Sequence, residues 1–286
     1  MLGEDLQTVL RHDYSLVGMD ARAPRDPDMP CIVCDITDQP GVERIMREQS
    51  PWLVIHAAAY TDVDGCERDP AKAELVNAEG TRIIADACRA CRSKLLYIST
   101  DYVFNGEKGS AYTENDLPQP LNAYGYSKLN GEKYVRELVR ESLIVRTSWL
   151  FGRYGKNFVA TIMEKAKQNQ PLQVVDDQRG CPTSTITLAT AIKRLVPAVF
   201  SAADPGNYGI YQVCNSGDCS WYEFAKTIVA FAKLPAEVMP VDSGKINRPA
   251  KRPRLSIMDT GRYENVTGDK ICSWQDALRQ YLACCA

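Results

Sequence analysis

The feature that most constrains the fold is a regular alternation of strand-like and helix-like segments along the first half of the 286-residue chain. Short apolar runs are followed by longer stretches with apolar residues at helical spacing, which is typical of a parallel sheet with helices on both faces. We therefore expect a Rossmann-like, doubly wound α/β fold. The expected strands are 14–20, 31–35, 52–57, 94–99 and 142–147, the expected helices are 3–11, 41–48, 70–91 and 123–140, and a helix 157–168 then precedes a sixth strand 173–175.

The composition argues against several kinds of partner. The chain has 34 basic and 36 acidic residues and a net charge of −2, so we expect neither nucleic acid nor a membrane surface as partner. No apolar run approaches the roughly 18 residues that a membrane span needs. The first residues show neither the basic nor the apolar region of a signal peptide, so we expect a cytoplasmic protein.

Eleven cysteines are spread along the chain, and in a protein without a visible signal peptide they indicate reduced thiols. Cys31 and Cys34 fall in an expected strand, and Cys88 and Cys91 fall in an expected helix. Cysteine packs there as a small hydrophobic residue. We therefore expect no zinc site and no other metal.

Tyr124 and Lys128 stand one helical turn apart, so both side chains lie on one helix face and can reach one reacting oxygen. A nearby cation lowers the pKa of a tyrosine, which turns the phenol into a usable general acid for ketone reduction. The apolar run 95–98 ends in Ser99 and Thr100, so this strand would deliver hydroxyl groups to the same place. We predict an active site here.

Two expected strands end in carboxylates, where ligands bind in a parallel α/β sheet. Asp20 is placed to hold the ribose 2′-hydroxyl of NAD, whereas Arg22 just beyond it would meet the 2′-phosphate of NADP. An ordinary polar strand end explains Asp20 equally well. Asp35 and Ile36 end the next strand, where they would cap a helix or touch an adenine.

The strand that ends at His56 continues with small residues, 57–59, which let a cofactor approach the backbone closely. A lone histidine at a strand end is usually structural. We therefore predict cofactor contacts for the alanines and no catalytic role for His56.

A dinucleotide fold opens with a strand, a glycine-rich turn and a helix whose N-terminus takes the pyrophosphate. Gly3 resembles the last glycine of such a turn, while the strand and the earlier glycines are missing from the sequence. That strand would lie beside the one ending at Asp20, and without it both neighbouring strands would expose apolar faces and unpaired backbone groups. We expect the native protein to begin upstream of Met1; the alternative is a chain damaged in stability and cofactor binding.

Seven segments together resemble the dTDP-4-dehydrorhamnose reductase family of extended short-chain dehydrogenases. They run from the third strand nearly to the C-terminus, and their combination is more specific than any one of them. The segments are 56–64 (HAAAYTDVD), 97–104 (YISTDYVF), 124–132 (YGYSKLNGE), 146–152 (RTSWLFG), 177–183 (DQRGCPT), 220–225 (SWYEFA) and 248–253 (RPAKRP).

The resemblance implies an NADPH- or NADH-dependent oxidoreductase that reduces the C4 keto group of dTDP-6-deoxy-L-lyxo-4-hexulose to dTDP-L-rhamnose. Tyr124 would give the proton, Lys128 would lower the tyrosine pKa and hold the nicotinamide ribose, and Thr100 would bond the keto oxygen. The implied substrate contacts are Thr100, Asp101, Tyr102, Phe104, Trp149, Asn157, Gln178, Arg179 and Thr183; for Phe104 and Trp149 plain core packing is the alternative. The implied cofactor contacts are Gly3, Asp20, Asp35, Ile36, Ala57, Ala58, Ala59, Tyr60, Asn77, Ser99, Tyr124 and Lys128.

The resemblance also implies two lobes. Residues 1–148, with parts of 172–232, would bind NAD(P), and 149–171 with 233–286 would form most of a smaller C-terminal substrate-binding lobe. Family members are often homodimers. Two alternatives stay open: a non-catalytic partner of another enzyme, similar to the regulatory β subunit of methionine adenosyltransferase, and a reductase or epimerase of another nucleotide sugar.

Overall fold

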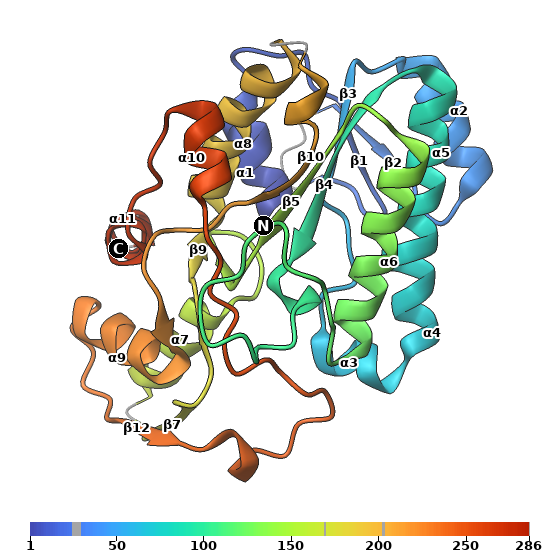
Figure 1. The fold of residues 1–286 in the computed structure, drawn as a ribbon. Coiled ribbons are helices and arrows are strands. Elements are labelled where there is room, and N and C mark those ends of the chain that lie inside the picture. The colour runs from blue at the N-terminus through green and yellow to red at the C-terminus, as the bar shows by residue number, and fades with distance from the viewer. Residues whose placement is uncertain (25–29, 169, 202–203, 286) are drawn as a thin grey trace.

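The structure, a computed structural model, describes residues 1–24, 30–168, 170–201 and 204–285 (Figure 1). Its central sheet is parallel, with strand order β10-β5-β4-β3. The strands are β3 (Leu53–His56), β4 (Lys94–Thr100), β5 (Ser142–Thr147) and β10 (Gly209–Gln212). β5 is buried along its whole length, as expected for an inner strand of a sheet covered on both faces.

The remaining two strands of the first half form a separate parallel pair, β1 (Gly18–Asp20) and β2 (Cys31–Val33). Within the described residues this pair is not joined to β3 by strand pairing. Leu53 and Ile55 of β3 are only half-buried, whereas the inner strand β5 is fully buried. The described strands of this half thus form a four-stranded sheet, together with β10, and a separate pair.

The sixth predicted strand forms, but it does not belong to the central sheet. Residues 173–175 do form a strand, β7 (Leu172–Val175), but it pairs in parallel with β12 (Val238–Val241) in a separate two-stranded sheet. The strand beside β5 is instead β10, which the sequence pattern did not predict. β10 reads Gly-Ile-Tyr-Gln, too short a run for side-chain alternation to stand out.

Helices cover both faces of the central sheet, which confirms the doubly wound fold (Figure 1). Leu96 and Ile98 of β4 pack in one core with α1 (Leu2–Leu10), α8 (Thr185–Phe200) and α10 (Gly261–Thr267). Leu95 and Tyr97 face the opposite way, because successive side chains of a strand alternate. They pack in a second core with α2 (Gln39–Gln49), α5 (Gly80–Cys91) and α6 (Ala123–Leu138).

The predicted helix 70–91 is helical throughout but not uniform. It consists of α4 (Pro70–Ala73), a π-helical segment Glu74–Glu79 and α5, and a short helix α3 (Val63–Arg68) precedes it. Asp69 caps it by accepting from Lys72 N, and Pro70 stands at the first helical position, which proline favours. π-helical turns often occur at functional sites, and this one carries Asn77.

A third core lies outside the central sheet. It is built from Phe151, Phe224 and Trp274 with other apolar side chains of α7 (Phe158–Lys167), α9 (Trp221–Phe231) and α11 (Trp274–Cys285), beside β7 and β12 (Figure 1). A capping box of Ser220 and Glu223 begins α9. Two short pairs complete the region: β6 (Leu150–Phe151) with β9 (Thr183–Ser184), and β8 (Arg179–Gly180) with β11 (Cys219–Ser220).

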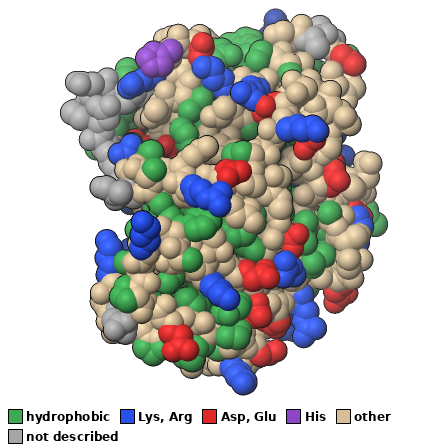
Figure 2. Space-filling view, turned by 90° about the vertical axis from the view of Figure 1, so that its left-hand side faces the viewer, with side chains coloured by type: hydrophobic (Ala, Val, Ile, Leu, Met, Phe, Trp, Pro, Cys, Tyr) green, Lys and Arg blue, Asp and Glu red, His purple; other side chains and the backbone are tan. Residues whose placement is uncertain are grey.

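The surface is mixed in charge. Basic and acidic side chains are interspersed over the face shown in Figure 2, in keeping with the net charge of −2. In the part of the chain that the structure describes, none of the helices has the length and apolarity to cross a membrane. Cys88 is buried in α5, as its helix pattern predicted. Cys34 is also buried, but it follows β2, which is not the buried strand that was expected, since Val33 is 60% exposed.

Candidate functional site

Tyr124 and Lys128 lie on the first turns of α6, whose start is well defined. Asn122 caps the helix by accepting a hydrogen bond from Gly125 N. Gly125 is required there, because a Cβ would come within 2.2 Å of Tyr102 O. The close approach sets the Tyr124 ring edge-on to the Tyr102 ring, with 5.8 Å between their centres.

Lys128 is buried, and its Nζ faces the backbone of β4. Nζ donates a 2.7 Å hydrogen bond to Ile98 O and lies 4.0 Å from the centre of the Tyr97 ring. Burial lowers the pKa of Lys128 to about 7, against the opposing effect of the Glu132 carboxylate. Both protonation states of this lysine are therefore accessible near neutral pH.

The pKa of Tyr124 differs from the sequence expectation, which had Lys128 lowering it. Burial raises the pKa of Tyr124 above its ordinary value, although a hydrogen bond with the Thr100 side chain acts to lower it. Asp101 and Tyr102 raise it further. The Lys128 ammonium is directed at Ile98 O and the Tyr97 ring, not at Tyr124. Desolvation of the Tyr124 phenol therefore determines the direction in which its pKa shifts.

The end of β4 brings hydroxyl groups to Tyr124, as the sequence predicted. Thr100 is buried; its Oγ1 donates to Asp101 Oδ1 at 3.1 Å and accepts from Tyr102 N at 3.2 Å. Thr100 also acts to lower the pKa of Tyr124, so the two hydroxyl-bearing side chains lie near one another. Their catalytic roles stay predictions, but this arrangement can orient a carbonyl oxygen and protonate it.

A buried ion pair beneath Lys128 was not predicted. Glu132 and Arg146 form two hydrogen bonds, 2.9 Å from Nε to Oε1 and 2.7 Å from Nη2 to Oε2. Ser99, predicted to contact the cofactor, donates to Glu132 Oε1 at 2.5 Å. The available sequence signal was spacing: Glu132 follows Lys128 by four residues, on the same helix face.

The predicted cofactor residues lie at the ends of the first strands. Ala57, Ala58 and Ala59 follow β3 and are half-buried. Tyr60 N donates to Asn77 Oδ1 at 2.7 Å, and Asn77 Nδ2 donates to Tyr60 O at 3.0 Å. Asn77 Nδ2 also bonds Ser127 Oγ on α6, so the backbone that follows β3 is fixed to the helix that carries Tyr124.

The other predicted cofactor residues divide by exposure. Asp20 is exposed and accepts from Arg22 N at 2.9 Å, while Asp35 accepts from both Thr37 N and Oγ1, which lowers the pKa of Asp35. Ile36 is buried against Gly80. Gly3 is exposed in the first turn of α1. A small-residue surface beside exposed carboxylates fits a dinucleotide, so the residues present are compatible with NAD(P).

Of the predicted substrate residues, Trp149 and Phe104 are placed very differently. Trp149 has a positive φ of 49° and stacks on Trp221, with 3.5 Å between ring centres. A Cβ at position 180 would meet its ring at 2.5 Å, so Gly180 is needed beneath it. Phe104 is fully buried and stacked on Tyr112, which favours core packing for this residue.

The remaining predicted substrate residues cap a helix, are buried or are paired. Asn157 caps α7 through Ala160 N, and Gln178 and Thr183 are buried. Arg179 is paired with Asp218 at 2.9 Å and with Glu223 at 3.0 Å. Its positive charge is thus largely offset by two carboxylates of this chain.

A C-terminal segment, 248–258, crosses the site and was not predicted as part of it. Arg252 forms an ion pair with Asp64 at 2.9 Å, and Asn122 Nδ2 donates to Lys251 O at 2.7 Å. Arg248 interacts with Tyr102, and burial together with the neighbouring Arg252 lowers the pKa of Arg248. This segment therefore brings two guanidinium groups close to the Tyr102 side of the site.

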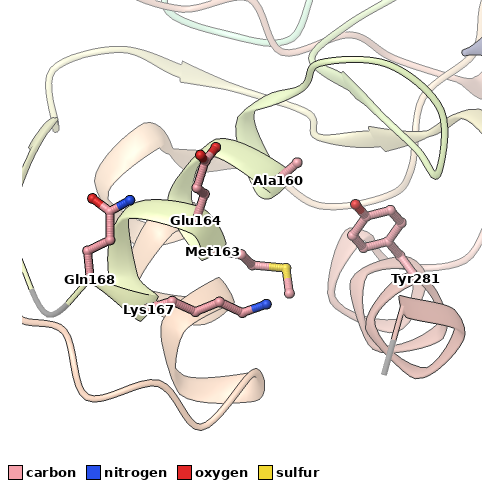
Figure 3. Close-up of a pocket in the computed structure, with 6 residues that line it drawn as sticks. All are labelled: Ala160, Met163, Glu164, Lys167, Gln168 and Tyr281. Atoms are coloured by element: carbon pink, nitrogen blue, oxygen red, sulfur yellow. The ribbon is translucent and has the colours of Figure 1, made fainter.

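A pocket between α7 and α11 is separate from these residues. Figure 3 shows that its lining comes from one side of α7 and from Tyr281 of α11. The lining residues are Ala160, Met163, Glu164, Lys167, Gln168 and Tyr281, none of which the sequence predicted as a site residue.

Comparison with known proteins shows the family of the chain. The model of the RmlD substrate binding domain family matches residues 1–286. The dTDP-4-dehydrorhamnose reductase of Streptomyces griseus is 40% identical over 248 residues, which are 86% of this chain and 81% of that protein. The spore coat polysaccharide biosynthesis protein SpsK of Bacillus subtilis strain 168 is 39% identical over 248 residues, 87% and 84% of the two chains.

The solved structures give the same result. The dTDP-4-dehydrorhamnose reductase of Bacillus anthracis, determined in complex with NADP, has a TM-score of 0.86 and 37% identity, covering 99% of this chain and 95% of that one. The Rossmann-like fold and the resemblance seen in the sequence are both confirmed. The chain belongs to the RmlD substrate binding domain family, among relatives that include dTDP-4-dehydrorhamnose reductases.

Proposed function

We propose that this chain reduces the C4 keto group of a dTDP-6-deoxy-4-keto-hexose to give dTDP-L-rhamnose, using NADPH or NADH. The observation that carries the proposal is the buried hydroxyl of Thr100, at the end of β4, which acts on the pKa of Tyr124, together with the buried Lys128 on the same helix as Tyr124. Relatives named dTDP-4-dehydrorhamnose reductase, one of them solved with NADP, support it.

In this proposal Tyr124 donates the proton that completes the reduction. Thr100 holds the keto oxygen by a hydrogen bond and keeps it within reach of the Tyr124 hydroxyl. Lys128 places a positive charge close to the end of β4. This charge stabilises the negative charge that develops on the keto oxygen and on the Tyr124 oxygen during the reaction. A bound nicotinamide supplies the hydride.

The cofactor would lie over the ends of β1, β2 and β3. Ala57, Ala58 and Ala59 leave the backbone open to a close approach, and Asn77 holds Tyr60 in place beside them. Asp20 and Arg22 are both exposed at the end of β1, so the adenosine ribose of either dinucleotide finds a partner there. Arg22→Ala is expected to weaken binding of NADPH and to leave binding of NADH unchanged, because only NADPH carries the 2′-phosphate.

The sugar would lie between the Tyr124 helix and the region around Trp149. We propose 1–148 with parts of 172–232 as the cofactor lobe, and 149–171 with 233–286 as most of the substrate lobe. The separate core around Phe151 supports a second lobe; it also takes in Phe224 from 172–232, while Tyr263 from 233–286 packs with the central sheet. The proposed sugar contacts are Thr100, Asp101, Tyr102, Trp149, Asn157, Gln178, Arg179 and Thr183, with Phe104 behind them in the core.

We also propose a cytoplasmic location and a homodimer. Leu75 and Tyr126, on the π-helical segment and on α6, are each more than half exposed, and we propose them as part of the surface that contacts a second copy. Sedimentation equilibrium of the purified chain tests the dimer, and Leu75→Glu with Tyr126→Glu should give monomers. A monomeric wild-type protein would contradict it.

The experiment that tests the function follows NADPH consumption by the purified chain with dTDP-6-deoxy-L-lyxo-4-hexulose, and identifies the product by mass and NMR. Turnover by the protein alone to dTDP-L-rhamnose supports the proposal and excludes a purely regulatory role. Cofactor binding without turnover, together with stable capture of a partner enzyme, would replace it by the regulatory alternative.

A further inference from the structure

Trp149 lies between the central sheet and the third core, in a backbone conformation that a bulky residue rarely adopts. It follows the end of β5 by two residues, and Thr147, the last residue of β5, is paired in register with Thr100. Its φ of 49° is in the left-handed region, which is unfavourable for a residue with a Cβ. Such a conformation persists only where the surrounding contacts enforce it, and it is found most often at active sites and ligand-binding sites.

The backbone around Trp149 is held by two hydrogen bonds. Thr183 N donates to Trp149 O at 3.3 Å, and Ser148 Oγ donates to Cys181 O at 2.6 Å. Both bonds connect the end of β5 to the segment 181–183. They fix the course of the chain at Trp149, but they leave the direction of its indole ring to other contacts.

The indole of Trp149 is held in place by Trp221. The two rings are stacked, with 3.5 Å between their centres and 7° between their planes. Gly180 lies against the same indole, because a Cβ there would come within 2.5 Å of Trp149 Cε2. Trp149 itself is only partly buried, so part of it stays accessible to a ligand.

Trp221 is itself fixed, because it is the first residue of a well-capped helix. Ser220 and Glu223 form the capping box of α9, and Ser220 Oγ also donates to Asp176 Oδ1 at 2.5 Å. The Phe158 ring packs on Trp221, with 4.5 Å between ring centres. Trp221 therefore offers Trp149 a rigid surface that is anchored in the third core.

We propose that Trp221 is a positioning residue: it holds the Trp149 indole as one side of the sugar site and so sets the affinity for the keto sugar. The proposal rests on the sugar contact proposed above for Trp149. Among the described residues, the hydrogen bonds of Thr100 and Lys128 involve neither indole. Loss of the stack should therefore weaken binding of the sugar and leave the transfer of the proton unchanged.

Trp221→Leu removes the ring and keeps an apolar side chain in the third core. It should raise the KM for the keto sugar roughly 5- to 10-fold, the loss expected for one aromatic pair, with kcat close to that of the wild-type protein. Trp221→Phe keeps an aromatic partner and should lie between the two. Trp52→Leu is the matched control at a 52% exposed position and should leave the KM unchanged. A KM unchanged in Trp221→Leu, or a loss confined to kcat, overturns the proposal.

A spectroscopic measurement checks the stack without any ligand. Two indoles stacked this closely couple electronically, and the coupling gives a pair of bands of opposite sign in the far-ultraviolet circular dichroism spectrum. The chain has four tryptophans, so the bands have to be assigned. Trp149→Phe and Trp221→Phe should each abolish them, whereas Trp52→Phe should leave them in place. A wild-type spectrum without these bands, or bands that survive Trp221→Phe, overturns the proposal.

Binding of dTDP-L-rhamnose, measured by titration calorimetry, separates this inference from the proposed function because it needs no turnover. Trp221→Leu should bind the dTDP sugar roughly 5- to 10-fold more weakly than the wild-type protein, and Trp52→Leu equally well. Equal affinity in Trp221→Leu and the wild-type protein overturns the positioning role. If the affinities differ as expected but the wild-type protein does not reduce the keto sugar, the reductase function fails and the positioning role is supported. A wild-type protein that does not bind the dTDP sugar overturns both.

Discussion

Glu132 and Arg146 face one another through two hydrogen bonds of 2.9 and 2.7 Å, although neither side chain is more than 3% exposed. The pair joins α6, which carries Tyr124 and Lys128, to β5 beneath it. The Arg146 guanidinium also lies 5.1 Å from the centre of the Phe104 ring. Two charges buried at this depth are stable only as a pair, so each depends on the other for the geometry of the site.

Glu132→Gln should therefore destabilise the protein by about 3–5 kcal/mol, since it leaves the Arg146 charge buried without a partner. Urea denaturation at neutral pH measures the loss. The control is the double substitution Glu132→Leu with Arg146→Met, which removes both charges and should recover much of the stability. A double variant as unstable as Glu132→Gln would show that packing, and not charge, holds this contact.

Tyr124→Phe should lose roughly 10²–10⁴-fold in turnover, because the proposed general acid is removed while the ring remains. Binding of NADPH and the urea midpoint should stay close to those of the wild-type protein. Tyr126→Phe is the matched control, two residues along the same helix and 55% exposed. Near-normal turnover in Tyr124→Phe would show that another group supplies the proton.

The parts of the fold that were predictable from sequence are those written in local patterns. β4 and β5 stand out because their runs, Lys-Leu-Leu-Tyr-Ile-Ser-Thr and Ser-Leu-Ile-Val-Arg-Thr, are long and buried on both faces. The Tyr124–Lys128 pair follows from helical spacing alone. The pairing of β10 with β5 and of β7 with β12 was not predictable, because the sequence of a four-residue strand does not indicate which strand it pairs with.

Contacts between residues far apart in the sequence were not predicted, because no local pattern indicates them. Arg252 and Asp64 are 188 residues apart, and Ser256 reaches Asp101 from the same C-terminal segment. The direction of a pKa shift depends on burial, which the sequence indicates only coarsely. Thus Lys128 lies on the same helix as Tyr124, but it is not among the groups that shift the tyrosine pKa.

Acid stability should depend on His56. Its ring is buried, with Nε2 3.0 Å from Thr81 Oγ1, and burial together with Lys128 lowers the pKa of His56 to about 3, from 6.5. Between these values the unfolded chain binds a proton that the folded chain does not, so stability falls as pH falls. The loss from pH 7 to about pH 4.5 should be on the order of 2–3 kcal/mol smaller in His56→Gln than in the wild-type protein.

The only other histidine supplies the control for that comparison. His12 is exposed, so His12→Gln should follow the wild-type dependence of stability on pH. Urea midpoints of the three proteins, measured at a series of pH values, decide the matter. Parallel curves for all three would mean that His56 takes up a proton in the folded state.

Lys128 should make the protein less stable at low pH, because its side chain is buried and becomes charged there. Burial lowers the pKa of Lys128 from 10.5 to about 7. Between these values the unfolded chain holds a proton that the folded chain has released, so the contribution of Lys128 to stability rises with pH across this window. Below about pH 7 the folded protein must bury the charge, and the full cost is present.

Lys128→Met removes that cost, so its stability relative to the wild-type protein should be greatest near pH 6 and decline towards pH 10, while turnover is lost. Urea midpoints at both pH values provide the measurement. Lys133→Met, at an exposed position of the same helix, is the control and should show no such trend. A stability difference that is the same at both pH values would mean that Lys128 keeps its proton throughout. In that case a permanent ammonium behind Tyr124 stabilises the developing oxyanion at every pH, and Lys128 contributes nothing to the pH dependence of the rate.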